Sequence, residues 1–179
     1  DASAKKIENM VSNIPGIHNV QNILAVCSMS VELGIELDEI KLALEGFEGV
    51  NRRFSLIRNY KGIKIFDDYG HHPIEIKATL SAAREITKDK VVAIVQPHRF
   101  TRLKLLFEDF TSAFNDADIV FITEIFSAGE VNHYDLSNHS LINSLIAAGH
   151  KDVRVFEDEE LKKLVENKLK KGDIVVFLG

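Results

Sequence analysis

The sequence predicts an α/β fold: a mostly parallel sheet with helices on both faces, preceded by a short helical hairpin. From about residue 60 onward, short apolar runs alternate with helical patterns, which is typical of parallel strands joined by right-handed crossovers. The runs Val91–Val95 and Ile119–Ile122 are apolar without interruption, as expected for strands buried on both faces. Before residue 49 the apolar residues instead follow a helical spacing, which predicts the hairpin.

Two apolar patterns define the hairpin. The first helix is expected from about His18 to Gly34, because glycine is favoured just after a helix end. The second is expected from about Asp38 to Glu45. The only cysteine, Cys27, is expected to be a buried thiol, and a single cysteine excludes an intrachain disulfide. The first stripe has the spacing i, i+3, i+4, i+7 and i+11 and consists of Val20, Ile23, Leu24, Cys27 and Val31.

Two strands and a helix are expected next. The strands run from Phe54 to Tyr60 and from Ile63 to Phe66, and Lys61-Gly62 joins them. A helix then opens at Pro73, because proline suits the first helical position, and His72 is a possible cap.

The remaining elements continue the alternation. One helix is expected from about Phe100 to Phe114, because Leu103, Phe107, Phe110 and Phe114 share a stripe. A polar stretch from Ser127 to Asp135 follows the strand at 119–122. The chain then predicts a helix around Leu141–Ile146 that Gly149 ends, a strand at Val153–Phe156, a helix around Leu161–Leu169, and a strand from Ile174 to Phe177.

Composition limits the classes of function. The chain has 179 residues, 45% of them hydrophobic, and a net charge of −5. A negative net charge disfavours non-specific binding to nucleic acid, and no apolar run approaches the ~20 residues that span a bilayer. We therefore expect no nucleic-acid or membrane partner, and the lack of an intrachain disulfide suits a protein of the reducing cytoplasm. The chain begins without Met and stops on an apolar strand, so we expect a piece of a longer protein.

Polar residues gather in four clusters. Gly16–Asn22 places His18, Asn19 and Asn22 near the start of the first helix, where amides suit the edge of a nucleobase or serve as a simple cap. Arg52-Arg53 fits phosphate, or is a solvated basic pair. The other two clusters, Asp67–Pro73 and Gln96–Arg102, each follow a predicted strand.

The last two clusters are expected to face each other. Ligands of open α/β sheets bind at the carboxyl ends of the strands, and consecutive strands usually neighbour each other. Carboxylates and guanidiniums together suit an amino acid or a phosphorylated intermediate. Three histidines also raise the possibility of zinc, but their spacing is weak for a zinc site, and we assign no metal ligand. The alternative is that the Asp and His residues of these clusters are ordinary cap and turn residues without a function.

Four motifs carry a resemblance to a known family: GIHNVQN, GVNRRF, DDYGHHP and QPHRFTR, in this order. Together they resemble the Mur ligases, the ATP-dependent ligases of peptidoglycan synthesis, over about residues 14–179. The Tyr-Gly-His-His and His-Arg-Phe-Thr-Arg combinations are most similar to the members that join L-alanine to UDP-N-acetylmuramate. The resemblance implies that residues 1–49 are the tail of the family's central ATPase domain. Residues 50–179 would be its Rossmann-like C-terminal domain.

The resemblance also implies roles for individual residues. The family activates the muramyl carboxylate as an acyl phosphate, which the amine of alanine attacks. His18, Asn19 and Asn22 would contact adenine, Asp68 the ribose, and Arg53 or its neighbour Arg52 a phosphate of ATP. Arg53 and His71 would be catalytic. The alanine pocket would consist of Tyr69, His71, His98, Arg99 and Arg102, with the arginines holding the alanine carboxylate.

Some parts of the family's site are absent from this sequence. The chain contains no GxxxxGK[ST] phosphate loop. ATP and Mg²⁺ are implied as cofactors, with the magnesium ligands outside this chain, and the missing N-terminal and central domains would be its partners. The fragment is expected to be inactive alone. Two alternatives remain: a ligase that attaches a preformed peptide to the same sugar, and a non-catalytic nucleotide-binding module.

Overall fold

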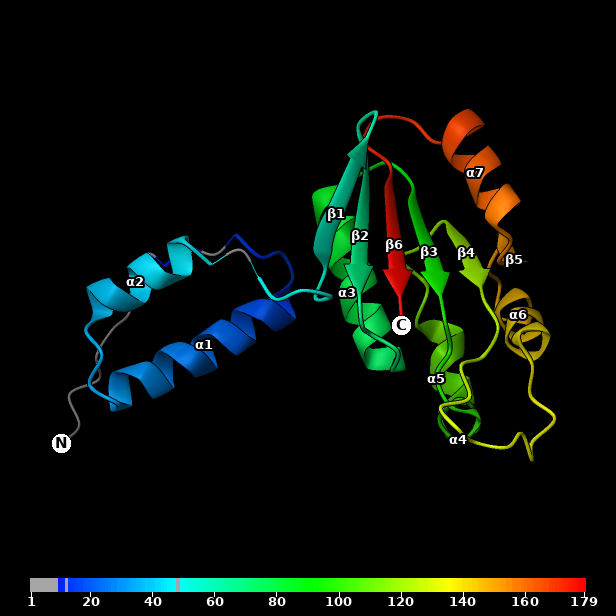
Figure 1. The fold of residues 1–179 in the computed structure, drawn as a ribbon, viewed down its shortest axis with the longest axis horizontal. Coiled ribbons are helices and arrows are strands. Elements are labelled where there is room, and N and C mark those ends of the chain that lie inside the picture. The colour runs from blue at the N-terminus through cyan, green and yellow to red at the C-terminus, as the bar shows by residue number, and fades with distance from the viewer. Residues whose placement is uncertain (1–9, 12, 48) are drawn as a thin grey trace. The chain divides into compact units, whose positions relative to one another are not determined.

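The computed structural model describes residues 10–11, 13–47 and 49–179 (Figure 1). The chain divides into two compact units, Asp1–Gly49 and Val50–Gly179. Each unit is described by itself.

The first unit is a hairpin of two helices, α1 (Ile17–Glu32) and α2 (Leu37–Glu45). Cys27 is fully buried, as expected, and its Sγ lies 3.5 Å from Sδ of Met10. The rest of the predicted stripe is helical but poorly covered: Leu24 is 58% exposed. Two short helices are too few to bury their own apolar faces, because a small unit has too much surface for its volume.

The second unit is built on a six-stranded sheet in the order β1-β2-β6-β3-β4-β5. Every neighbouring pair is parallel except β1 and β2. The strands confirm the predicted positions, and β3 and β4 coincide with the two uninterrupted apolar runs. Their bounds are β1 (Ser55–Tyr60), β2 (Ile63–Asp68), β3 (Val91–Val95), β4 (Ile119–Ile122), β5 (Val153–Val155) and β6 (Ile174–Leu178).

The hairpin between β1 and β2 brings the start of β1 to the edge where the parallel strands end. Ser55 pairs with Asp67 in this antiparallel ladder. The turn needs Gly62, which has a φ of 87°, because an added Cβ would stand 2.5 Å from Cγ of Lys171. Residues 52–54 therefore lie beside the end of β2, although they precede it by a whole hairpin.

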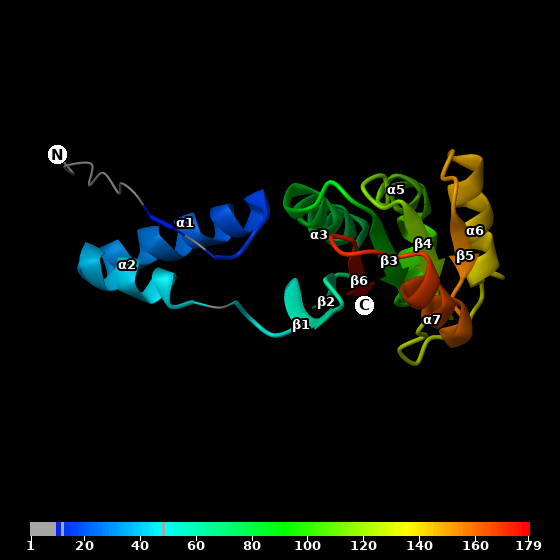
Figure 2. The same cartoon turned by 90° about the horizontal axis from the view of Figure 1, so that it is seen from above.

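Helices cover both faces of the sheet, as predicted (Figure 2). On one face lie α3 (Pro73–Ile86), α4 (Phe100–Leu105), α5 (Phe107–Ser112) and α6 (Asn138–Ala147); the other carries α7 (Asp158–Asn167). The two faces form separate apolar clusters because successive strand residues point to opposite sides. Val176 belongs to the first cluster, and its neighbour Val175 belongs to the second.

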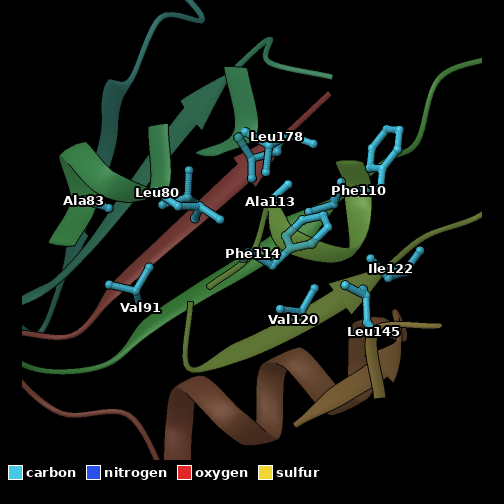
Figure 3. Packing of buried hydrophobic residues seen from close by; sticks show 14 of the residues in the cluster. Leu80, Ala83, Val91, Phe110, Ala113, Phe114, Val120, Ile122, Leu145 and Leu178 are labelled. Carbon is cyan, nitrogen blue, oxygen red and sulfur yellow. The ribbon is translucent and has the colours of Figure 1, made fainter. Parts of the chain in front are cut away.

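The larger cluster packs helices α3, α5 and α6 onto the sheet (Figure 3). Leu80 from α3, Phe114 after α5 and Leu145 from α6 are fully buried. They lie over strand residues such as Val91 and Val120. This packing fixes the helices to the sheet and with them the turns that enter each helix.

Two expectations were wrong. The single helix from Phe100 to Phe114 is two helices, because Leu106 has φ −112° and ψ 21°, outside the helical region. The apolar stripe runs through this break, so the spacing gave no sign of it. The strands β2 and β3 are not neighbours either, because β6 lies between them.

No helix in the described part of the chain is long and apolar enough to cross a membrane.

We predict that Leu80→Ala destabilises the chain by about 2–5 kcal/mol, because it leaves a cavity in the larger cluster. Ile74 is the matched control: it lies on the same helix but is 73% exposed. Ile74→Ala should change the free energy of unfolding by no more than about 0.5 kcal/mol. Urea denaturation followed by circular dichroism measures both, and equal effects would contradict the packing of α3.

Candidate functional site

The candidate site lies at the carboxyl edge of the parallel strands (Figure 1). Backbone hydrogen bonds link the strand ends in a row there. Gly179 N donates to Asp68 O at 3.1 Å, Gln96 N to Leu178 O at 2.9 Å, and Thr123 N to Val95 O at 2.9 Å. The segments that follow β2, β3 and β4 therefore leave the sheet at the same edge, with the end of β6 between the first two.

Asp68 ties this edge together. Its Oδ2 accepts from Phe54 N at 2.8 Å, and its Oδ1 accepts from Gly70 N at 2.7 Å. The residue is only 5% exposed. Gly70 has to be glycine, because an added Cβ would stand 2.6 Å from Asp68 Oδ1. Asp68 thus joins the start of β1 to the turn after β2.

Arg52 packs against the same turn. Its Nε lies 3.6 Å from Asp67 Oδ2, and its guanidinium lies 4.6 Å from the centre of the Tyr69 ring. Tyr69 N donates to Arg52 O at 2.8 Å. Arg52 therefore contacts several groups of this edge, whereas Arg53 makes one ion pair, to Glu75 at 3.9 Å.

The turn enters α3 through a capping box, which confirms His72 as the cap and Pro73 at the helix start. His72 Nδ1 accepts from Ile74 N at 3.3 Å, and Glu75 Oε2 accepts from the backbone N–H groups of His71 and His72 at 3.2 Å. Although partial burial opposes it, these two hydrogen bonds hold the pKa of Glu75 below its usual value, with help from the charges of His71 and Arg53.

Three rings meet in front of this cap. The imidazoles of His71 and His98 are stacked, with centroids 4.8 Å apart and planes 3° from parallel. Tyr69 meets His71 edge-on at 4.9 Å, and the tilted ring of Phe126 contacts His98 with the centroids 5.0 Å apart. The structure therefore brings together residues from the two turns, as the sequence predicted.

Both imidazoles have a pKa below the ordinary value, which favours the neutral form. Partial burial lowers the pKa of His71, and the nearby positive charge of Arg102 lowers it further. Partial burial also lowers the pKa of His98, followed by the charges of His71, Arg102 and Arg52. Because a carbonyl oxygen only accepts, the 2.9 Å contact between His71 Nδ1 and Tyr69 O places the proton on Nδ1. In the neutral form of His71 the lone pair is therefore on Nε2.

The two arginines of the second turn have different surroundings. Arg99 adopts a φ of 68°, and its Nε lies 2.9 Å from Glu130 Oε1. The same carboxylate accepts from Thr101 N at 2.9 Å and from Thr101 Oγ1 at 2.7 Å. Arg102 is half-buried and acts electrostatically on both imidazoles. The arginines of this turn are therefore not equivalent.

Three residues of the site were missed from the sequence: Glu75, Phe126 and Glu130. Glu75 had a signal, because a glutamate three residues after a helix cap is the mark of a capping box. Phe126 lies directly before the polar stretch Ser127–Asp135 and Glu130 lies within it, and neither segment carries a local pattern pointing toward the turn at 96–102.

His18, Asn19 and Asn22 lie in the first unit, on the opening turns of α1. The side chain of Asn19 donates to Pro15 O at 2.8 Å, whereas Asn22 is exposed. His18 Nδ1 is buried and has no hydrogen-bond partner among the residues that the structure describes. Among the described residues, no three His, Cys, Asp or Glu side chains lie together as a metal site.

Known proteins resemble this chain closely. Residues 52–179 match the family described as "Mur ligase, glutamate ligase domain". The UDP-N-acetylmuramate–L-alanine ligase of Bartonella henselae is 48% identical over 97% of this chain, and that of Dinoroseobacter shibae is 50% identical over 93%. The chain spans only 37% and 36% of these two relatives.

Solved structures agree on the fold. A UDP-N-acetylmuramate–alanine ligase from Thermotoga maritima has a TM-score of 0.77 and 32% identity, and the match covers 98% of this chain and 37% of that one. A murein peptide ligase from Psychrobacter arcticus has a TM-score of 0.60 at 23% identity over 95% of this chain and 35% of its own, which supports the fold alone.

We predict that Asp68→Asn destabilises the chain by about 1–3 kcal/mol, because the amide NH₂ would face one of the two backbone N–H groups. Asp67→Asn is the matched neighbour: it loses only a partly exposed ion pair, worth up to about 1 kcal/mol. Urea denaturation of both variants measures the difference. A larger loss of stability from Asp67→Asn would contradict the role of Asp68 in joining the start of β1 to the turn after β2.

We predict that Arg102→Ala raises the pKa of His71 and His98, because it removes one of the positive charges that oppose protonation. Burial remains, so both should stay below the ordinary value of 6.5. An NMR titration of the imidazole nitrogens measures this. Lys104→Ala, an exposed cation on the same helix, should leave both pKa values in place.

The same shifts give stability a definite pH dependence. The unfolded chain binds protons on these histidines near pH 6.5, and the folded chain binds them only at lower pH. Folding stability therefore falls as the pH drops from about 6.5 through the folded-state pKa values. Arg102→Ala should weaken this fall, whereas an unchanged pH profile would contradict the placement of Arg102.

Proposed function

Because the chain belongs to the Mur ligase family, we propose that it is part of an ATP-dependent ligase that joins L-alanine to UDP-N-acetylmuramate in peptidoglycan synthesis. The name carried by relatives of 45–50% identity supports this choice within the family. The observation that carries the proposal is the stacked pair of His71 and His98, which joins the two motif turns at one edge of the sheet.

The second unit supplies the amino-acid pocket. Tyr69, His71 and His98 form a wall of rings, and Arg102 supplies positive charge beside them. A small side chain such as the methyl of alanine suits a wall of rings, and a guanidinium suits the α-carboxylate. Arg99 belongs to the same turn as these residues.

The chemistry follows from the family reaction. ATP transfers its γ-phosphoryl group to the muramyl carboxylate, which gives an acyl phosphate and ADP. The neutral amine of alanine attacks the acyl carbon, and the tetrahedral intermediate expels phosphate as the amide forms. The attacking nitrogen loses one proton as the amide forms, and Nε2 of neutral His71 can accept it.

Four motif residues and Arg53 are proposed to contact the nucleotide. His18, Asn19 and Asn22 contact adenine, since an amide offers both a donor and an acceptor. Arg53 contacts an ATP phosphate from an exposed position. Asp68 has two unused lone pairs for ribose hydroxyls, although only 5% of the residue is exposed.

The parent protein supplies the rest. Residues 1–49 are the tail of a central ATPase domain, and a phosphate loop elsewhere in the parent grips most of the triphosphate. Mg²⁺ neutralises phosphate charge when it is bound, through ligands that lie outside this chain. UDP-N-acetylmuramate binds to an N-terminal domain, and the protein works in the cytoplasm. The fragment is inactive alone.

We expect the complete gene product that carries this chain to release phosphate from ATP only when both UDP-N-acetylmuramate and L-alanine are present. A phosphate-release assay, with mass spectrometry of the product, measures this. A preformed tripeptide should react poorly in place of alanine. Equal coupling of the tripeptide would contradict the choice of amino acid, and no coupling of either would contradict the activity.

A further inference from the structure

The loop after β4 holds the second motif turn by its backbone. Phe126 N donates to Pro97 O at 2.9 Å, and Arg99 N donates to Phe126 O at 2.8 Å, which makes a short parallel bridge between His98 and Phe126. The bridge holds Arg99 at a φ of 68°, a conformation that a residue other than glycine rarely adopts. Strain of this kind persists only where the surroundings impose it.

Glu130 completes this attachment with its side chain. Its two carboxylate oxygens accept from Thr101 N, Thr101 Oγ1 and Arg99 Nε, at 2.7–2.9 Å. Thr101 N is one of the first amides of α4, which have no partner within the helix. Glu130 therefore binds the first turn of α4. Arg102 is the residue that follows Thr101 in this helix.

We propose that Glu130 is a positioning residue of the amino-acid site, which holds the 98–102 turn and occupies Arg99, so that Arg102 alone supplies the charge that binds the substrate carboxylate. The inference rests on the proposed function and refines it, because the family resemblance implies that both arginines hold that carboxylate.

The charges support this division between the arginines. Hydrogen bonds from Thr101 N and Thr101 Oγ1, together with the charge of Arg99, keep the pKa of Glu130 below its usual value, so the carboxylate stays ionised beside Arg99. Among the residues that the structure describes, Arg102 has no carboxylate within ion-pair distance, and its charge reaches His71 and His98. An unpaired cation attracts an incoming carboxylate more strongly than one that is already neutralised.

Glu130→Gln in the complete gene product tests the proposal. Glutamine keeps one acceptor oxygen but loses the charge that holds Arg99. We expect the KM for alanine to rise by about tenfold, as for the loss of hydrogen bonds to a charged group, while the KM for ATP changes by less than about twofold. Glu124→Gln is the matched control, because Glu124 lies on the same segment and its carboxylate accepts from Asn138 instead.

A second measurement is independent of catalysis. In ¹⁵N NMR spectra of the 179-residue chain, Glu130→Gln should shift the signals of Thr101 N, Arg99 Nε and Arg102 N, and Glu124→Gln should leave them in place. If the wild-type protein couples no alanine, the proposed function fails, and these spectra still decide whether Glu130 holds the turn.

The outcomes separate the possibilities. A rise in the KM for alanine alone, with the NMR shifts, supports the proposal. An unchanged or lower KM for alanine overturns it. Glu130 would then have no effect on alanine binding, or it would only keep Arg99 from binding the alanine carboxylate. Equal rises in the KM for alanine and for ATP also overturn it, because the effect would then be a general loosening of the domain.

Discussion

The site depends first on the carboxylate of Asp68. By accepting the backbone N–H groups of Phe54 and Gly70, it joins a segment before β1 to a turn after β2, two places separated by a complete hairpin. These two hydrogen bonds set the direction in which the chain leaves β2. Tyr69 and His71 follow Asp68 in the sequence, so the same contacts determine where these two residues lie at the edge of the sheet. A buried carboxylate with two backbone donors is satisfied, which is why it is tolerated at 5% exposure.

The position of β6 shapes the rest of the site. This strand returns from the end of the sequence to lie between β2 and β3, so the two motif turns flank its end instead of adjoining each other. The rings of His71 and His98 bridge the interval by stacking. The loop after β4 then fixes the second turn from the outer side, through the backbone of Phe126 and the side chain of Glu130. Three strand ends thus contribute to one cluster of side chains.

Much of the fold was predictable because it follows from local pattern. Uninterrupted apolar runs gave β3 and β4, and proline after a histidine gave the start of α3. The break at Leu106 was not predictable, since the apolar stripe continues through it and neither glycine nor proline marks it. The stripe of α1 correctly predicted a helix, but it did not show which of its residues are buried, because burial depends on what else is present to cover a residue such as Leu24.

The sequence by itself determined which residue types gather at each strand end and the family to which they belong, because both are written in short contiguous motifs. Only the tertiary structure decided which contacts each of those residues makes and which charges act on it. Whether Arg99 is paired depends on Glu130, 31 positions later in the numbering, and whether His71 is neutral depends on burial and on Arg102. Contacts of this kind arise where separate βα units meet at one edge, and no local spacing encodes them.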